Sequence, residues 1–84
     1  MMTVMQEYGI ESMKVVESDG VQDLEIRYRE GAEPLEWTRG VQGWALREVG
    51  LDPKIWRLGA GLLLRASDGA LVEVVELRRA GGEE

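Results

Sequence analysis

The chain of 84 residues contains no cysteine and no histidine. Without cysteine it has no disulfide, no thiol nucleophile and no thiolate ligand for a metal. Without histidine it lacks the side chain that most often serves as a general base and as a metal ligand. Hydrolytic or metal chemistry would have to rest on carboxylates alone, and the acidic residues form no paired-carboxylate motif. We therefore expect a protein that is not an enzyme, with no catalytic residue, no metal and no cofactor.

Basic side chains are also few, with 10 against 16 acidic ones and a net charge of −6. A chain of this charge repels phosphate backbones, which disfavours nucleic-acid binding. No apolar run approaches the ~20 residues of a membrane helix, and the N-terminus lacks the pattern of a signal peptide. We expect a cytoplasmic protein with neither a nucleic-acid nor a membrane partner, and the acidic balance suits a basic protein partner.

The length predicts one domain. Residues 1–12 show no sustained apolar period and are interpreted as an N-terminal extension with a short strand near residues 3–7. Residues 13–79 form the domain, and residues 80–84 are expected to be a flexible C-terminal tail, because they are rich in glycine and charge.

Asp19-Gly20 predicts a β-hairpin, since apolar and charged residues alternate on both sides of this pair. A two-residue turn at this point would place Val15 opposite Leu24 on one face. On the other face it would place Lys14 opposite Glu25, an opposite-charge pair worth about 0.2–1 kcal/mol. One face of this hairpin should therefore face the core and the other should face solvent.

A helix is predicted over residues 38–49, with Thr38 able to cap its N-terminus. A second turn of the same kind, Asp68-Gly69, joins predicted strands over residues 55–66 and 70–79. Both strands carry apolar residues on both faces, which predicts that they lie in the interior of the sheet.

The order hairpin, helix, hairpin predicts an α+β fold, ββαββ, with one helix packed across a mixed sheet. The residues expected to be mostly buried in one core are Met13, Val15, Leu24, Ile26, Val41, Ala45, Leu63 and Val74.

The last eight residues, 77–84, combine a Leu-Arg pair with Gly81-Gly82 and then Glu83-Glu84. Glycine has no Cβ, so such a tail can thread a narrow active site, and a glycine carboxylate is an unhindered acyl group. The alternative is a frayed, glycine-rich end without function.

This tail resembles the C-terminus of ubiquitin-like proteins, with Glu83-Glu84 added. The element order is that of the β-grasp fold to which those proteins belong. Glu33-Pro34 stands just before the helix, as a Glu-Pro pair does in ubiquitin. The segment Gly50-Leu51-Asp52-Pro53, followed by Arg57-Leu58, is similar to the Gly-Ile-Pro-Pro stretch and Arg-Leu pair of ubiquitin.

The resemblance implies a compact, bacterial-type protein modifier. A peptidase would remove Glu83-Glu84, and an E1-like adenylating enzyme would activate the carboxylate of Gly82. An E2-like enzyme could then pass the acyl group to a target, and the tail could also seat in a neighbouring copy. Gly81 and Gly82 would form the conjugation and activation site. The residues expected to dock the tail are Leu77, Arg78 and Arg79, although the two arginines could instead only solvate the strand end.

The chain also departs from ubiquitin. Residues 58–82 are shorter than their counterpart, which favours an alternative, a sulfur carrier with a thiocarboxylate at Gly82 for cofactor synthesis. A third hypothesis is a plain acidic protein-binding or inhibitor module. Lys14 and Lys54 are the only lysines that could accept conjugation, and Lys14 is expected mainly to pair with Glu25.

The candidate partner surface lies where the predicted third strand begins. Its tryptophan could be a binding hot spot or could belong to the core. Its two glycines could let the backbone of a partner approach closely. The residues of this surface are Trp56, Leu58, Gly59 and Gly61. By contrast, Trp44 on the predicted helix is expected to lie in the core.

Overall fold

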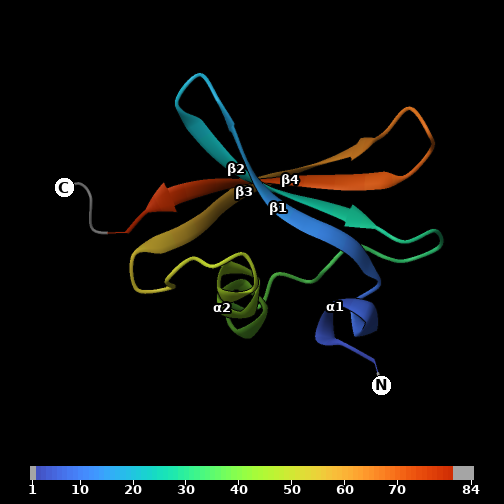
Figure 1. The fold of residues 1–84 in the computed structure, drawn as a ribbon, viewed down its shortest axis with the longest axis horizontal. Coiled ribbons are helices and arrows are strands. Elements are labelled where there is room, and N and C mark those ends of the chain that lie inside the picture. The colour runs from blue at the N-terminus through green and yellow to red at the C-terminus, as the bar shows by residue number, and fades with distance from the viewer. Residues whose placement is uncertain (1, 81–84) are drawn as a thin grey trace.

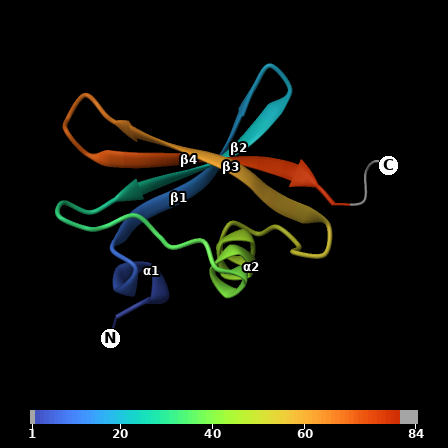
Figure 2. The same ribbon diagram turned by 180° about the vertical axis from the view of Figure 1, so that it is seen from behind.

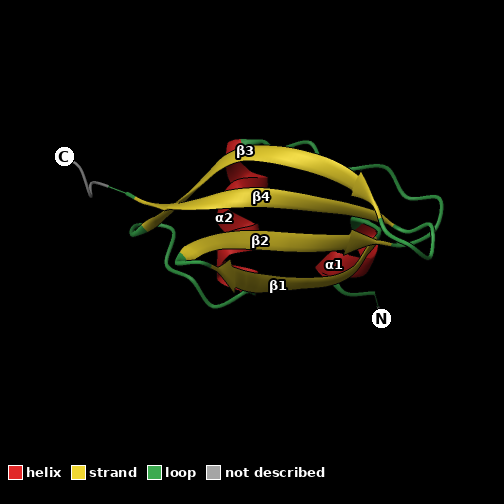
Figure 3. Ribbon diagram, turned by 90° about the horizontal axis from the view of Figure 1, so that it is seen from above, coloured by secondary structure: helices red, strands yellow, loops and turns green. Residues whose placement is uncertain are grey.

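A computed structural model describes residues 2–80 of the chain as one four-stranded sheet with two helices (Figure 1). The strand order is β1-β2-β4-β3, and both helices lie on the same face of the sheet (Figure 3). Figure 2 shows the connection between β2 and α2 on this face as well. The elements are α1 (Val4–Glu7), β1 (Ile10–Ser18), β2 (Val21–Tyr28), α2 (Arg39–Glu48), β3 (Trp56–Arg65) and β4 (Leu71–Arg79).

The sheet is antiparallel at every pairing within the described chain. The α+β class is confirmed, but the predicted mixed sheet is wrong and the β-grasp arrangement is not confirmed. The reason lies in which strand of the first hairpin takes the central place. β2 is the more deeply buried of the two strands and pairs with β4, which runs in the opposite direction.

The first hairpin has the predicted register, with Val15 opposite Leu24 and Lys14 opposite Glu25. The Nζ atom of the lysine lies 3.5 Å from the Oε1 atom of the glutamate. Asp19 and Gly20 have φ angles of 54° and 79°. Positive φ at both central residues is the geometry that matches the twist of a two-residue hairpin, and it explains why an Asp-Gly pair fixes this turn.

The N-terminal segment differs from the prediction. Residues 4–7 form α1 rather than a strand, because Thr3 and Gln6 make a capping box. The Gln6 amide donates to Thr3 Oγ1, and the Thr3 amide donates to the Gln6 side chain. β1 then begins at Ile10, which is 2% exposed and belongs to the core. Part of the predicted extension is therefore structural.

α2 confirms the predicted helix. Thr38 is its N-cap and accepts a hydrogen bond from the amide of Val41. The helix is followed by Gly50, whose φ of 82° is readily adopted only by glycine. Ala45 and Leu46 are the buried residues of this helix.

The core is built mainly from α2 and the two central strands, with Ile10 added from the start of β1. It consists of Ile10, Leu24, Ile26, Tyr28, Ala45, Leu46, Val75 and Leu77. Among the predicted core residues, Leu24, Ile26 and Ala45 are confirmed.

The prediction is wrong for Val15 and Leu63, which are exposed, and Met13, Val41 and Val74 are only half-buried. The short helix leaves the outer strands, with Val15 and Leu63, largely uncovered. Val74 lies on the other face of the sheet, which carries no helix in the described chain. β4 is an interior strand as predicted, but β3 lies at an edge of the sheet.

Candidate functional site

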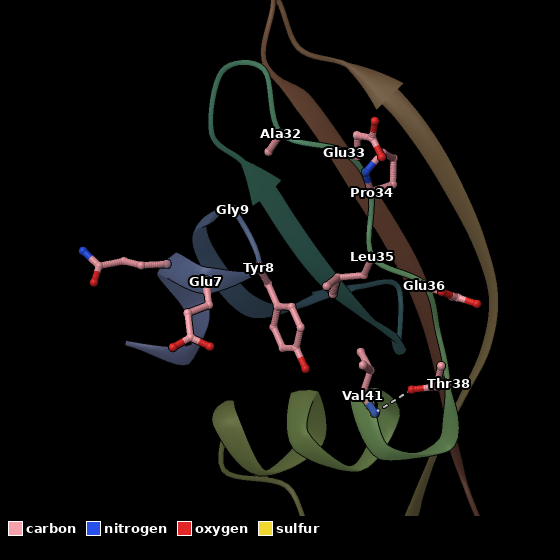
Figure 4. Close-up of a pocket in the computed structure, with 11 residues that line it drawn as sticks. Glu7, Tyr8, Gly9, Ala32, Glu33, Pro34, Leu35, Glu36, Thr38 and Val41 are labelled. Carbon is pink, nitrogen blue, oxygen red and sulfur yellow. Dashed lines mark hydrogen bonds between the residues drawn. The ribbon is translucent and has the colours of Figure 1, made fainter. Parts of the chain in front are cut away.

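An acidic groove opens between α1, the connection from β2, and the start of α2 (Figure 4). It has a volume of about 510 Å³. Its lining residues are Gln6, Glu7, Tyr8, Gly9, Ala32, Glu33, Pro34, Leu35, Glu36, Thr38 and Val41.

The floor of the acidic groove is apolar. Figure 4 shows the side chains of Tyr8, Leu35 and Val41 pointing into the space between the connection and α2. The Tyr8 ring packs edge-on against Trp44, with 4.9 Å between the ring centroids. Trp44 is half-buried and packs against the core, close to its predicted place.

Three exposed glutamates, Glu7, Glu33 and Glu36, are among the lining residues, and their segments form the rim of the acidic groove. None of the lining residues is basic. The negative potential is therefore not neutralised by the groove itself. Sequence reasoning did not identify this site, because it is assembled from three segments that are separate in the chain.

A buried carboxylate holds one wall of the groove in place. Glu73 on β4 is only 7% exposed and accepts hydrogen bonds from Tyr28 Oη at 2.8 Å and Trp37 Nε1 at 2.9 Å. Tyr28 Oη in turn accepts a bond from the amide of Leu35. Because Leu35 and Trp37 belong to the connection, this network ties the connection to the sheet.

Burial, and with it the hydrogen bond to the Glu73 carboxylate, raises the pKa of Tyr28 above its ordinary value. No ion pair reaches Glu73 within residues 2–80. A buried carboxylate without a cation is unusual, because burial penalises charge. Glu73 interrupts the apolar run of residues 71–75 in β4, and this was the sequence signal that could have identified it.

A small cavity of about 160 Å³ lies beside Glu73 at the β3 edge. It brings together three members of the predicted partner surface, Leu58, Gly59 and Gly61. A Cβ atom on Gly61 would lie 3.2 Å from Glu73 Oε2, so the missing side chain leaves room next to the carboxylate. The fourth member, Trp56, does not line this cavity. Its ring packs under the guanidinium of Arg79, whose Cζ atom lies 5.2 Å from the ring centroid.

The base of the tail is attached to the sheet. Leu77 is buried in the core, whereas Arg78 and Arg79 are exposed. The Ala80 amide, at the first residue of the predicted tail, donates to the carbonyl of Ile55. The predicted activation and processing residues, Gly81, Gly82, Glu83 and Glu84, lie outside the described residues.

The two predicted acceptor lysines are both exposed. Lys14 pairs with Glu25 as expected, and Lys54 lies in the turn before β3, where its amide donates to Asp52 Oδ1.

Within residues 2–80, no three acidic side chains gather in a way that could hold a metal ion. No helix in this part of the chain has the length and apolar character needed to span a bilayer. Comparison of the chain with models of protein families, with characterised proteins and with solved structures finds no match.

Proposed function

We propose that the protein is a non-catalytic binding module whose acidic groove takes a basic, partly apolar segment of another protein. The observation that carries this proposal is an apolar floor with three exposed glutamates and no basic side chain among the lining residues. Charge complementarity of this kind accelerates association and selects against acidic partners.

The floor and the rim have separate roles in this proposal. Apolar side chains of the partner would cover Tyr8, Leu35 and Val41, which stabilises the complex by removing apolar surface from water. Basic side chains would lie along the rim and set specificity. The network around Glu73 holds the wall in position, so little ordering is needed on binding.

Binding is expected for an acetylated hexapeptide of alternating arginine and leucine, followed by the intrinsic fluorescence of the protein. Trp44 contacts Tyr8 of the floor and should report occupancy. The double variant Glu33→Lys/Glu36→Lys should weaken binding on the order of tenfold or more, since it reverses the rim charge. Added salt should weaken binding by the wild-type protein.

Glu17→Lys is the matched control for one charge reversal, because Glu17 is exposed near the tip of the first hairpin and does not line the groove. It should leave the affinity nearly unchanged. Equal binding of a hexapeptide of alternating glutamate and leucine would contradict the proposal, as would equal effects of Glu17→Lys and of Glu33→Lys alone.

A second proposal is the ubiquitin-like modifier, with Gly82 as acyl donor after removal of Glu83-Glu84. The antiparallel sheet lends it no support. It is supported by the exposure of Arg78 and Arg79 at the end of a central strand, immediately before the tail, where an adenylating enzyme could bind them.

The tail proposal predicts that a chain ending at Gly82 becomes competent for activation, whereas the same chain with Gly82→Ala is impaired. Each form would be co-expressed with the genes that lie next to the gene for this protein. The intact mass of each form would then be measured. Larger covalent adducts support the modifier, and an exchange of one oxygen for sulfur supports the alternative sulfur carrier. An unchanged mass in the shortened chain would contradict both.

A further inference from the structure

The two edges of the sheet differ in how they are protected. β1 carries the charged residues Glu11, Lys14 and Glu17 and has a register shift near its start. Charges and irregularities of this kind prevent an edge from pairing with another chain. β3 also has a register shift, between Leu58 and Gly61. Its second half, residues 61–65, lies beyond this shift, carries no charge before Arg65 and pairs regularly with β4.

This unprotected half of β3 is also strongly apolar at its surface. Leu62, Leu63 and Leu64 are 61%, 48% and 46% exposed. Leu62 and Leu64 lie opposite Val74 and Val72 of β4. These two pairs therefore share the face of the sheet that carries no helix in the described chain. An unpaired edge joined to an apolar patch favours strand addition.

We propose that β3 pairs in antiparallel fashion with β3 of a second copy, about a two-fold axis at Leu63. In this register Leu62 of each copy lies opposite Leu64 of the other, which extends the apolar patch across the junction. A two-fold axis at Gly61 would instead place Arg57 opposite Arg65, and like charges directly opposite destabilise a strand pair.

The same register supplies a cation for Glu73, which forms no ion pair among residues 2–80 of its own chain. It places Arg65 of one copy opposite Gly61 of the other, with Cβ positions about 4.5–5.5 Å apart. Residues 61 and 65 share the face that carries the helices, where Glu73 Oε2 lies 3.2 Å from the Cβ position of Gly61. The guanidinium can therefore enter the cavity of about 160 Å³ that Glu73 and Trp37 line.

Arg65 is available for this role. It is exposed, and its Nη1 donates a hydrogen bond to the carbonyl of Gly69 in the adjoining turn. Each dimer would contain two such pairs of Arg65 with Glu73. The acidic groove takes no part in this interface, so the dimer goes beyond the proposed function and can be tested separately.

Sedimentation equilibrium of the full chain should show a monomer–dimer equilibrium. Arg65→Glu should raise the dissociation constant on the order of a hundredfold or more, because it places two carboxylates side by side in each half of the interface. The matched control is Arg57→Glu, which makes the same charge change at an exposed residue of the same strand outside the proposed contact. It should leave the dissociation constant nearly unchanged.

The register has its own test, since the chain has no cysteine of its own. On the two-fold axis Leu63 lies opposite Leu63 of the second copy, whereas the two Leu62 residues lie farther apart. Leu63→Cys should therefore oxidise to a disulfide-linked dimer much faster than Leu62→Cys. A monomer at every concentration, equal effects of the two arginine variants, or faster oxidation of Leu62→Cys would overturn the proposal.

Discussion

Replacing Leu24 or Ile26 with alanine is expected to lower the free energy of unfolding by about 2–5 kcal/mol in each case. Both side chains are 0% exposed and lie on β2, a central strand of the sheet. Removing their methyl groups loses the free energy of transfer from water and leaves a cavity that the neighbouring strands cannot fill. Urea denaturation, followed by tryptophan fluorescence, measures the loss as a shift in midpoint.

Leu62→Ala is the matched control, since it deletes the same atoms from a side chain that is 61% exposed. At a protein concentration where the chain is monomeric, its cost should stay within about 0.5 kcal/mol. Losses under about 1 kcal/mol at both Leu24 and Ile26 would contradict the assignment of the buried face, because fully buried leucine and isoleucine cost more than that.

Tyr28→Phe should destabilise the protein by about 2–3 kcal/mol, although it deletes only one oxygen atom. That oxygen donates to Glu73 and accepts from the amide of Leu35. Without it, a buried carboxylate loses a donor and a backbone amide loses its acceptor. Tyr8→Phe deletes the same atom where no hydrogen bond is recorded in the described residues, and it should cost less than about 1 kcal/mol.

The same hydroxyl predicts a pH dependence. The pKa of Tyr28 is raised in the folded state, so its contribution to stability is complete below the unfolded pKa of about 10. It is lost as the pH rises from there toward the folded pKa. The stability difference between wild type and Tyr28→Phe should therefore shrink above this pH. A difference that stays constant in alkaline solution would show that Tyr28 does not titrate with unfolding.

The sequence predicted the elements whose causes are local. In the first Asp-Gly turn both Asp19 and Gly20 adopt positive φ, whereas in the second only Gly69 does, within the longer turn that the pairing of Ala66 with Ala70 closes. The Thr38 cap marks the start of α2. The register of the first hairpin follows from its turn length alone, which is why the pairing of Lys14 with Glu25 was predictable.

Features that depend on distant residues were missed. Whether β1 or β2 lies beside β4 is decided by packing against α2, so the antiparallel sheet and the edge position of β3 could not be derived from local patterns. α1 is too short to show an apolar period, and a single capping box holds it. The Glu73 network needs the connection folded back over the sheet before Trp37 can reach it.

The pairing of β2 with β4 also governs how fast the protein can fold. Each hairpin brings together neighbours in the chain and can form within about 1–10 μs. The central ladder instead joins Asp23 to Glu76, so a long intervening loop must close before any of its contacts form. Isolated two-stranded hairpins are only marginally stable. The slow step should therefore be the encounter of two preformed hairpins, and the nucleus should contain residues from both β2 and β4.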